Sequence, residues 1–333
     1  MDKKAKNILR YLFWAAVSVV LVYFCLRAIN WAQFLEALRQ CRWEWVAMAM
    51  VFGMAGMLSR GLRWHMLMEP FDHSLSRRAV IDSNNIGQAV NLVLPRIGDV
   101  MKLGYILKHS AKGKEGKHLV SFDKSLGTVI TERVWDAIVV ALMSVVLLVV
   151  KWDTFGAFLR GGLSGVGAGI WWSLVGLAAL AIGLLVLTYL LRRKGGLWSR
   201  IWGYIHGFLQ GMISFRQMKR PGLFLLHTVL IWGFYWLTSA CIIWALQDME
   251  AFSSLNWADA FFLMIAGAIS SLLPVPGGFG AYHGVVAGTL LSIWNIPMGV
   301  GMIYATLNHE SQVLAQALYG LFSYVRETFF RKR

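Results

Sequence analysis

Charged and strongly polar side chains that interrupt apolar segments are the residues of this sequence best suited to chemistry. They gather in three stretches, LPRIGD at 94–99, TERVWD at 131–136 and NHESQ at 308–312. An ionisable side chain at the depth of a bilayer costs roughly 3 kcal/mol even on insertion scales. Each stretch is therefore a candidate binding site, and each also has a purely structural explanation.

The first stretch contains Arg96 and Asp99, with Lys102 one turn further on. A helix that begins after the Pro/Gly break would offer free backbone N–H groups and the positive end of its dipole, which suit a phosphate group. The alternative is that Arg96 pairs with Asp99 and only holds the break in place.

The second stretch places three charges within two helical turns. Glu132 and Asp136 are four residues apart and share a helix face, and Arg133 precedes Asp136 by three and can pair with it. These residues form either a polar wall of an internal site or a closed salt-bridge network that fixes helix packing.

The third stretch supplies Asn308, His309 and Glu310, about two turns into the last long helix. His283 lies shortly after the second Pro/Gly break and is a further candidate for the same site. Single histidines are more often structural, so we rank His283 and His309 below Arg133.

The sequence has none of the patterns that indicate catalysis or a cofactor. It lacks a Walker-type loop, an HExxH motif and a nucleophile elbow. The histidines are dispersed, and the three cysteines (Cys25, Cys41 and Cys241) have neither disulfide nor metal-site spacing. We therefore expect no catalytic residue, no metal and no cofactor.

Composition indicates a membrane protein made only of helices. Of the 333 residues 57% are hydrophobic and 15% charged, and the mean hydropathy is +0.57; a soluble domain averages about 25% charged residues. Several nearly uncharged windows of about 20 residues match the thickness of a bilayer. The net charge of +15 comes from basic loop clusters, which indicate membrane orientation and attraction to anionic lipid headgroups rather than nucleic acid.

The positive-inside rule predicts six full transmembrane helices with both termini in the cytoplasm. The acidic segment 247–259 is then outside, and an interfacial helix follows the fourth span. The expected spans are 10–29, 45–67, 125–150, 168–191, 222–246 and 298–325, and the interfacial helix is 197–215. All belong to one transmembrane domain, residues 1–333.

Two pairs of shorter helices, 79–94 with 98–110 and 258–273 with 279–294, each flank a break. Each pair begins and ends on one side of the membrane, as a re-entrant hairpin does, although two full crossings would satisfy the same charges. The residues that form the breaks are Pro95, Gly98, Pro274, Pro276, Gly277, Gly278 and Gly280.

The two breaks also resemble each other. AVNLVLPRIGD at 89–99 aligns with AISSLLPVPGG at 268–278, an offset of 274 − 95 = 179 residues. The same offset relates the neighbouring long helices, which run in opposite directions. The sequence therefore predicts an inverted repeat with halves of about 45–150 and 222–325, an arrangement typical of transporters whose site lies where the broken helices meet.

Arg60, Arg63 and Trp64 occur near the expected cytoplasmic end of the second span. Either the two arginines extend to the headgroups, or they control the access of lipid to the interior.

Four motifs together resemble the transmembrane region of lysylphosphatidylglycerol synthases, the flippase-like domain family. They are RGLRW at 60–64, NLVLPRIGDVMKLGYIL at 91–107, ERVWD at 132–136 and PVPGGFG at 274–280. The resemblance implies lipid handling. The chain stops at RETFFRKR, without the soluble aminoacyl-transfer domain, so we do not expect a synthase. Relatives usually carry an acidic residue where His283 stands, and often an arginine near Asn308 and His309.

We therefore expect a multi-pass lipid translocase of the bacterial inner membrane. It would move a lipid with an anionic or phosphate headgroup between leaflets by alternating exposure of a central polar cavity. The alternatives are an intramembrane enzyme acting on lipid phosphates or lipid-linked sugars, and a non-transporting partner of a separate lipid-modifying enzyme. The sequence gives no oligomeric state.

Overall fold

The computed structural model describes residues 31–94, 97–111, 119–150, 218–271 and 275–330, together with a few isolated positions. The expected helices at 10–29, 168–191 and 197–215 lie wholly or mostly outside these residues, as do Pro95, Arg96 and Pro274. The chain forms two compact units, one of Met1–His118 with Met218–Arg333 and one of Leu119–Gln217.

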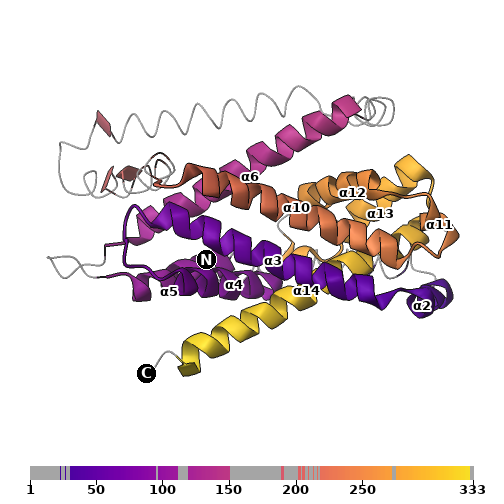
Figure 1. Ribbon diagram of the computed structural model, residues 1–333, viewed down its shortest axis with the longest axis horizontal. Helices are drawn as coiled ribbons and strands as arrows, with labels where there is room; N and C mark the ends of the chain where they lie inside the picture. Colours follow the sequence, from indigo (N-terminus) through magenta and orange to yellow (C-terminus); the bar gives the residue numbers. More distant parts are fainter. Residues whose placement is uncertain are drawn as a thin grey trace, which may run out of the picture. The chain divides into compact units, whose positions relative to one another are not determined.

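Every regular element in the described ranges is a helix, so the prediction of an all-helical protein is confirmed (Figure 1). The elements are α2 (Trp31–Gln40), α3 (Trp43–Met68), α4 (Arg77–Val93), α5 (Ile97–His109), α6 (Phe122–Val150), α10 (Pro221–Ala245), α11 (Glu250–Ser253), α12 (Trp257–Ser270), η3 (Pro276–Gly278), α13 (Ala281–Trp294), α14 (Met298–Val325) and η4 (Arg326–Phe330). Of these, α6 belongs to the second unit and the others to the first.

Two of the described helices, α3 and α10, are long and apolar enough to cross a membrane. Their 26 and 25 residues correspond to roughly 38 Å at about 1.5 Å per residue, more than a hydrocarbon core of about 30 Å. Helices α6 and α14 are longer, with 29 and 28 residues, but each contains one of the polar stretches. The full set of six spans stays a prediction.

Helices α3 and α10 form an antiparallel pair (Figure 1). At one end the Arg42 N–H donates to the Ala245 carbonyl oxygen over 3.0 Å, and the Arg42 guanidinium pairs with Asp248. At the other end Arg63 Nη1 donates to Thr228 Oγ1 over 3.4 Å. The pair is thus connected near both of its ends.

In the first helical hairpin, α4 packs directly on α5. Their closest approach is between Gly87 and Gly98, since a Cβ atom added at Gly87 would lie 2.8 Å from the Gly98 carbonyl oxygen. Asn91 Oδ1 accepts a hydrogen bond from the Gly98 N–H over 2.9 Å, which joins the end of α4 to the start of α5. Any larger residue at either glycine would force the helices apart.

In the second helical hairpin, α12 packs on α13 around the expected break. The chain there forms the short turn η3, in which Gly277 has φ 58°, Gly278 φ 76° and Gly280 φ 80°. This left-handed backbone is readily accessible only to glycine. Gly277, Gly278 and Gly280 supply the positive φ values of this turn, where any other residue would be strained. Gly98, which was also expected at a break, lies within α5.

Each hairpin of the first unit packs against a long helix. Helix α3 packs on α4 of the first hairpin, and α10 packs in the same way on α12 of the second. Helix α14 contacts α3, α4 and α13. The corresponding contacts of α6 would fall between the two units, so the inverted repeat stays a prediction.

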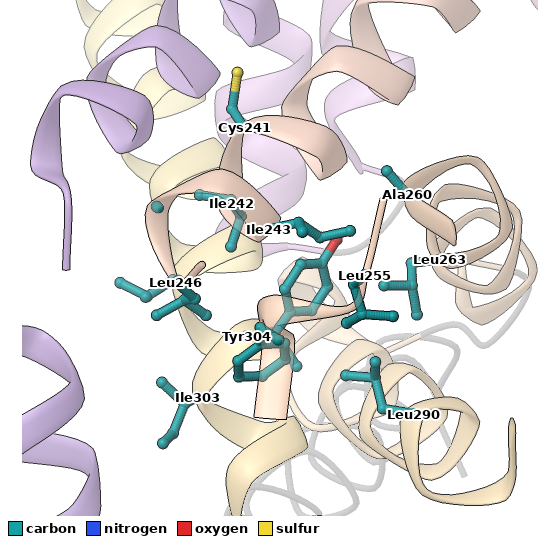
Figure 2. Packing of buried hydrophobic residues seen from close by; sticks show 14 of the residues in the cluster. Cys241, Ile242, Ile243, Leu246, Leu255, Ala260, Leu263, Leu290, Ile303 and Tyr304 are labelled. Carbon is teal, nitrogen blue, oxygen red and sulfur yellow. The ribbon is translucent and has the colours of Figure 1, made fainter. Parts of the chain in front are cut away.

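A core of aliphatic side chains surrounds Tyr304 of α14 (Figure 2). Leu255, Leu263 and Leu290 come from the second hairpin and the loop before it, and Ile243 comes from α10. The buried Tyr304 hydroxyl donates to the Ser239 carbonyl oxygen over 3.2 Å. This core fixes α14 relative to the second hairpin, and so fixes the polar residues that α14 carries one turn later.

Candidate functional site

The second helix break lies against the end of α4 in the first unit. The turn η3 contacts α4, and a Cβ atom added at Gly277 would lie 3.0 Å from the Leu92 carbonyl oxygen. Leu92 is in the last turn of α4, just before the first break. Backbone from the two hairpins therefore approaches closely where both helices end.

The polar stretch of α14 lies against the second break. His309 Nε2 is 2.9 Å from the Gly277 carbonyl oxygen, and His309 Nδ1 is 3.0 Å from Glu310 Oε1. His283, from the first turn of α13, brings its Nε2 within 3.5 Å of the same Glu310 oxygen. We call His283, His309 and Glu310 the His–His–Glu cluster.

Aromatic side chains line the cluster. The His309 ring lies 5.2 Å from that of Phe279 and 5.1 Å from that of Tyr282, between ring centroids. Asn308 Nδ2 donates to the Tyr282 hydroxyl over 2.6 Å. The side chains of His283 and His309 are 9% and 11% exposed, whereas Glu310 is 41% exposed. The cluster is therefore buried on the histidine side and open on the carboxylate side.

The structure thus brings together the four residues that the sequence suggested for one polar site, His283, Asn308, His309 and Glu310. His283 comes from α13 and the other three from α14, and at least 25 positions of sequence separate them (308 − 283). The dispersed histidines of the sequence predicted no metal site. Residues 283, 309 and 310 nevertheless place three potential ligand atoms within 4.8 Å of one another.

The start of α5, the second helix of the first hairpin, has fewer free N–H groups for an anion than the sequence suggested. The Gly98 N–H is already bonded to Asn91 Oδ1, so one donor of the first turn of α5 is used inside the protein. Asp99 lies in that turn and is partly buried. Arg96 is outside the described residues, so both its expected role in binding a phosphate group and the alternative pairing with Asp99 stay predictions.

Lys102 lies in the interior, only 2% exposed, with its ammonium 4.5 Å from the centre of the Trp64 ring. Arg60 and Arg63 precede Trp64 on α3 and are also buried, at 7% and 0% exposed. The Arg60 guanidinium lies over Tyr235 and that of Arg63 over Phe224, both on α10. We call Arg60, Arg63 and Lys102 the buried cation group; its side chains do not extend to the surface, as headgroup contact would require.

The polar residues of α6, Glu132, Arg133 and Asp136, belong to the second unit. Each has an interaction partner. Their expected position opposite the polar stretch of α14 concerns the placement of one unit against the other, so it stays a prediction.

Sequence reasoning missed the polar run DSNN at 82–85 of α4. Asn84 is fully buried, and neither its amide nitrogen nor its amide oxygen has a hydrogen-bond partner among the described residues. Asn85 Nδ2 donates to Ser323 Oγ of α14 over 3.1 Å. The run of four consecutive polar residues within a buried helix was the available signal.

A groove of about 400 Å³ lies where α4 begins and α14 ends. Its lining includes Arg78, Asp82 and Arg326. Asp82 accepts two hydrogen bonds from the Arg326 guanidinium, one of them from Nε over 3.0 Å. The positive-inside rule predicts that these ends of α4 and α14 face the cytoplasm.

Comparison with known protein families assigns the chain to a class. It matches the family described as the lysylphosphatidylglycerol synthase TM region over residues 11–320. This range is most of the chain, so the protein belongs to that family, and the resemblance inferred from the motifs is confirmed. The family is an integral membrane domain. Comparisons with curated proteins and with solved structures gave no match.

Proposed function

We propose that this protein is a lipid translocase of the bacterial inner membrane, which moves a lipid with an anionic or phosphate headgroup between leaflets. Membership of a family related to lipid modification and flippase-like function supports the general class. The substrate, the multi-pass topology and the cellular membrane are part of the proposal.

The observation that carries the proposal is the close approach of the second helix break to the end of α4, Gly277 against Leu92, just before the first break. Non-helical backbone at membrane depth is tolerated where it is buried in protein or lines a polar cavity. Broken helices from two repeats that meet near the midplane are a recurring architecture of transporter binding sites. The His–His–Glu cluster lies directly at this contact.

The buried cation group suits the headgroup of such a lipid. Arg60, Arg63 and Lys102 place three basic side chains inside the protein, next to aromatic rings. A phosphate group that entered the interior would interact strongly with them, because the local dielectric is low. The buried amide of Asn84, which lacks a partner among the described residues, is a further polar group that a headgroup can satisfy.

Leaflet exchange in proteoliposomes tests the proposal. The protein is reconstituted with a fluorescent anionic phospholipid, and a membrane-impermeant quencher reports the label that remains in the inner leaflet. We expect the wild type to accelerate exchange over protein-free vesicles. Lys102→Gln should slow exchange at least about tenfold, since one buried phosphate interaction is worth more than about 1.4 kcal/mol.

The matched control is Lys108→Gln on the same helix, because Lys108 is exposed and lies over Tyr105. It should exchange lipid as the wild type does. Both variants must elute as monodisperse protein with wild-type melting temperatures. Wild-type vesicles that exchange neither anionic phospholipid nor a polyprenyl phosphate faster than empty vesicles would refute the proposal.

A second candidate function is an intramembrane enzyme acting on lipid phosphates. The His–His–Glu cluster favours it, since two histidines and a carboxylate around an open position are a recurrent arrangement in hydrolases. Release of water-soluble headgroup from the same vesicles, abolished by Glu310→Gln, would support the enzyme instead.

A further inference from the structure

The His–His–Glu cluster contains hydrogen-bond acceptors that face each other. The Gly277 carbonyl oxygen can only accept, so the contact of 2.9 Å requires a proton on His309 Nε2. A neutral His309 then presents the lone pair of Nδ1 to Glu310 Oε1 at 3.0 Å. Two acceptors at this distance repel unless a positive charge, either a proton or a metal ion, lies between them.

His283 is the third member and its side chain is more than nine-tenths buried. Its Nδ1 has no hydrogen-bond partner among the described residues. Its Nε2 faces Glu310 Oε1 at 3.5 Å, which is too long for an ordinary hydrogen bond. A buried imidazole without a normal hydrogen bond is unusual in a native structure, and a bound ion is one explanation for it.

We propose that His283, His309 and Glu310 bind a divalent transition-metal ion of the zinc type. The proposal concerns ion binding alone and does not depend on the proposed transport of lipid. Zn–N and Zn–O bonds of about 2.0–2.1 Å place two tetrahedral ligand atoms about 3.3 Å apart. The two ligand separations measured from Glu310 Oε1, 3.0 and 3.5 Å, lie on either side of this value.

The surroundings of His309 fit a metal ligand. Histidines that bind metal through one nitrogen usually donate the other N–H to a carboxylate or a backbone carbonyl, which fixes the tautomer. The Gly277 carbonyl oxygen provides this acceptor for His309. The positive φ of Gly277, 58°, belongs to the turn that presents the oxygen. The break in the second hairpin therefore orients the histidine.

The donor set determines the class of ion and its accessible chemistry. Two imidazole nitrogens and one carboxylate oxygen favour Zn²⁺ and similar ions over Mg²⁺ or Ca²⁺, which prefer oxygen ligands. Three protein ligands leave a fourth tetrahedral position for water or for a phosphate oxygen. The partly exposed side of Glu310 is the direction from which that fourth ligand would approach.

Metal content of the purified protein tests the proposal directly. The full-length protein is produced with an affinity tag that contains no histidine, incubated with zinc in detergent, desalted and measured by elemental mass spectrometry. We expect about one zinc per chain. Replacement by Co²⁺ should give the intense visible absorption of a tetrahedral site with nitrogen and oxygen ligands.

His283→Gln, His309→Gln and Glu310→Gln should each weaken zinc binding more than about tenfold, the loss that changing even an outer-shell partner produces. The matched control is His227→Gln. Among the described residues, His227 of α10 also has a buried nitrogen without a partner, but it belongs to no ligand cluster. It should keep one zinc per chain. Melting temperatures with and without zinc distinguish lost ion binding from misfolding, because zinc should raise the melting temperature of only the wild type and the control.

Failure of the wild type to retain zinc, cobalt or manganese above the level of a tag-only blank would overturn the proposal. Full zinc retention in folded Glu310→Gln and His309→Gln would overturn it as well. In either case a proton, rather than a metal ion, bridges His309 and Glu310. Lipid exchange without metal binding would support the proposed function and overturn this inference. Metal binding without lipid exchange would do the reverse.

Discussion

Replacing Gly98 with alanine should separate the two helices of the first hairpin. The added Cβ atom would overlap the Gly87 carbonyl oxygen and lie 2.8 Å from Asn91 Oδ1. Both obstacles are rigid, since one is backbone and the other is the side chain that caps α5. Relief of the overlap therefore requires movement of a whole helix.

The expected cost follows from three contributions. Overpacking of a tight contact destabilises by about 1–3 kcal/mol, and loss of the Asn91 hydrogen bond adds about 1 kcal/mol. The higher helix propensity of alanine returns about 1 kcal/mol. Gly98→Ala should therefore lower the free energy of unfolding by about 2 kcal/mol.

Gly104→Ala is the matched control, because Gly104 lies on the same helix and an added Cβ atom there would meet nothing within 4 Å. It should be neutral or stabilise by up to about 1 kcal/mol. Tryptophan fluorescence during heating in detergent reports both melting temperatures, and Gly98→Ala should melt roughly 5 °C lower than Gly104→Ala. Equal melting temperatures would show that α4 and α5 do not meet at Gly87 and Gly98.

Three further predictions concern the ends and contacts of the helices. Burial opposes ionisation of Asp72, but hydrogen bonds from Ser74 in the same loop and from Ser110 and Ala111 after α5 outweigh this and hold its pKa below 3.8. The stabilising contribution of the carboxylate is therefore present above pH 3.8 and is lost as the pH falls below it. The melting temperature of Asp72→Ala should approach that of the wild type under acid, and a constant difference from pH 7 to pH 3 would contradict this. Arg326→Ala leaves the buried Asp82 carboxylate without its ion pair and should lower the free energy of unfolding by about 2 kcal/mol, a figure discounted for the partial exposure of Arg326. Chemical denaturation measures this loss, and an unchanged denaturation midpoint would argue against the ion pair. Gly320→Ala would overlap Ala89 of α4 and should lower the melting temperature, whereas an unchanged value would place α14 further from α4.

The helices and breaks of the first unit were largely predictable from sequence because their signals are local. Hydrophobic length defines α3 and α10. Proline and glycine define the breaks, and Gly277 and Gly278 indeed take positive φ values. Membership of the family was equally predictable, because RGLRW and PVPGGFG are short contiguous motifs.

The partners of the polar side chains were not predictable, because they depend on packing between distant segments. His283 and His309 are 26 residues apart, and only the folding of α13 back on α14 brings them to one carboxylate. Nothing in the sequence marks Asn91 as special, and only the folding of the hairpin brings its side chain to the start of α5. The run DSNN is evident in the sequence, but its burial against α14 could not be predicted from it.

The pair of α3 and α10 has a consequence for movement. Its two helices are joined by Arg42 at one end and by Arg63 at the other, and the Trp45 and Trp244 rings lie 4.8 Å apart between centroids. Sliding one helix along the other would break contacts at both ends at once. Conformational change within the first unit should therefore leave this pair in place as a static frame, with the displacement taken up by the hairpins and by α14.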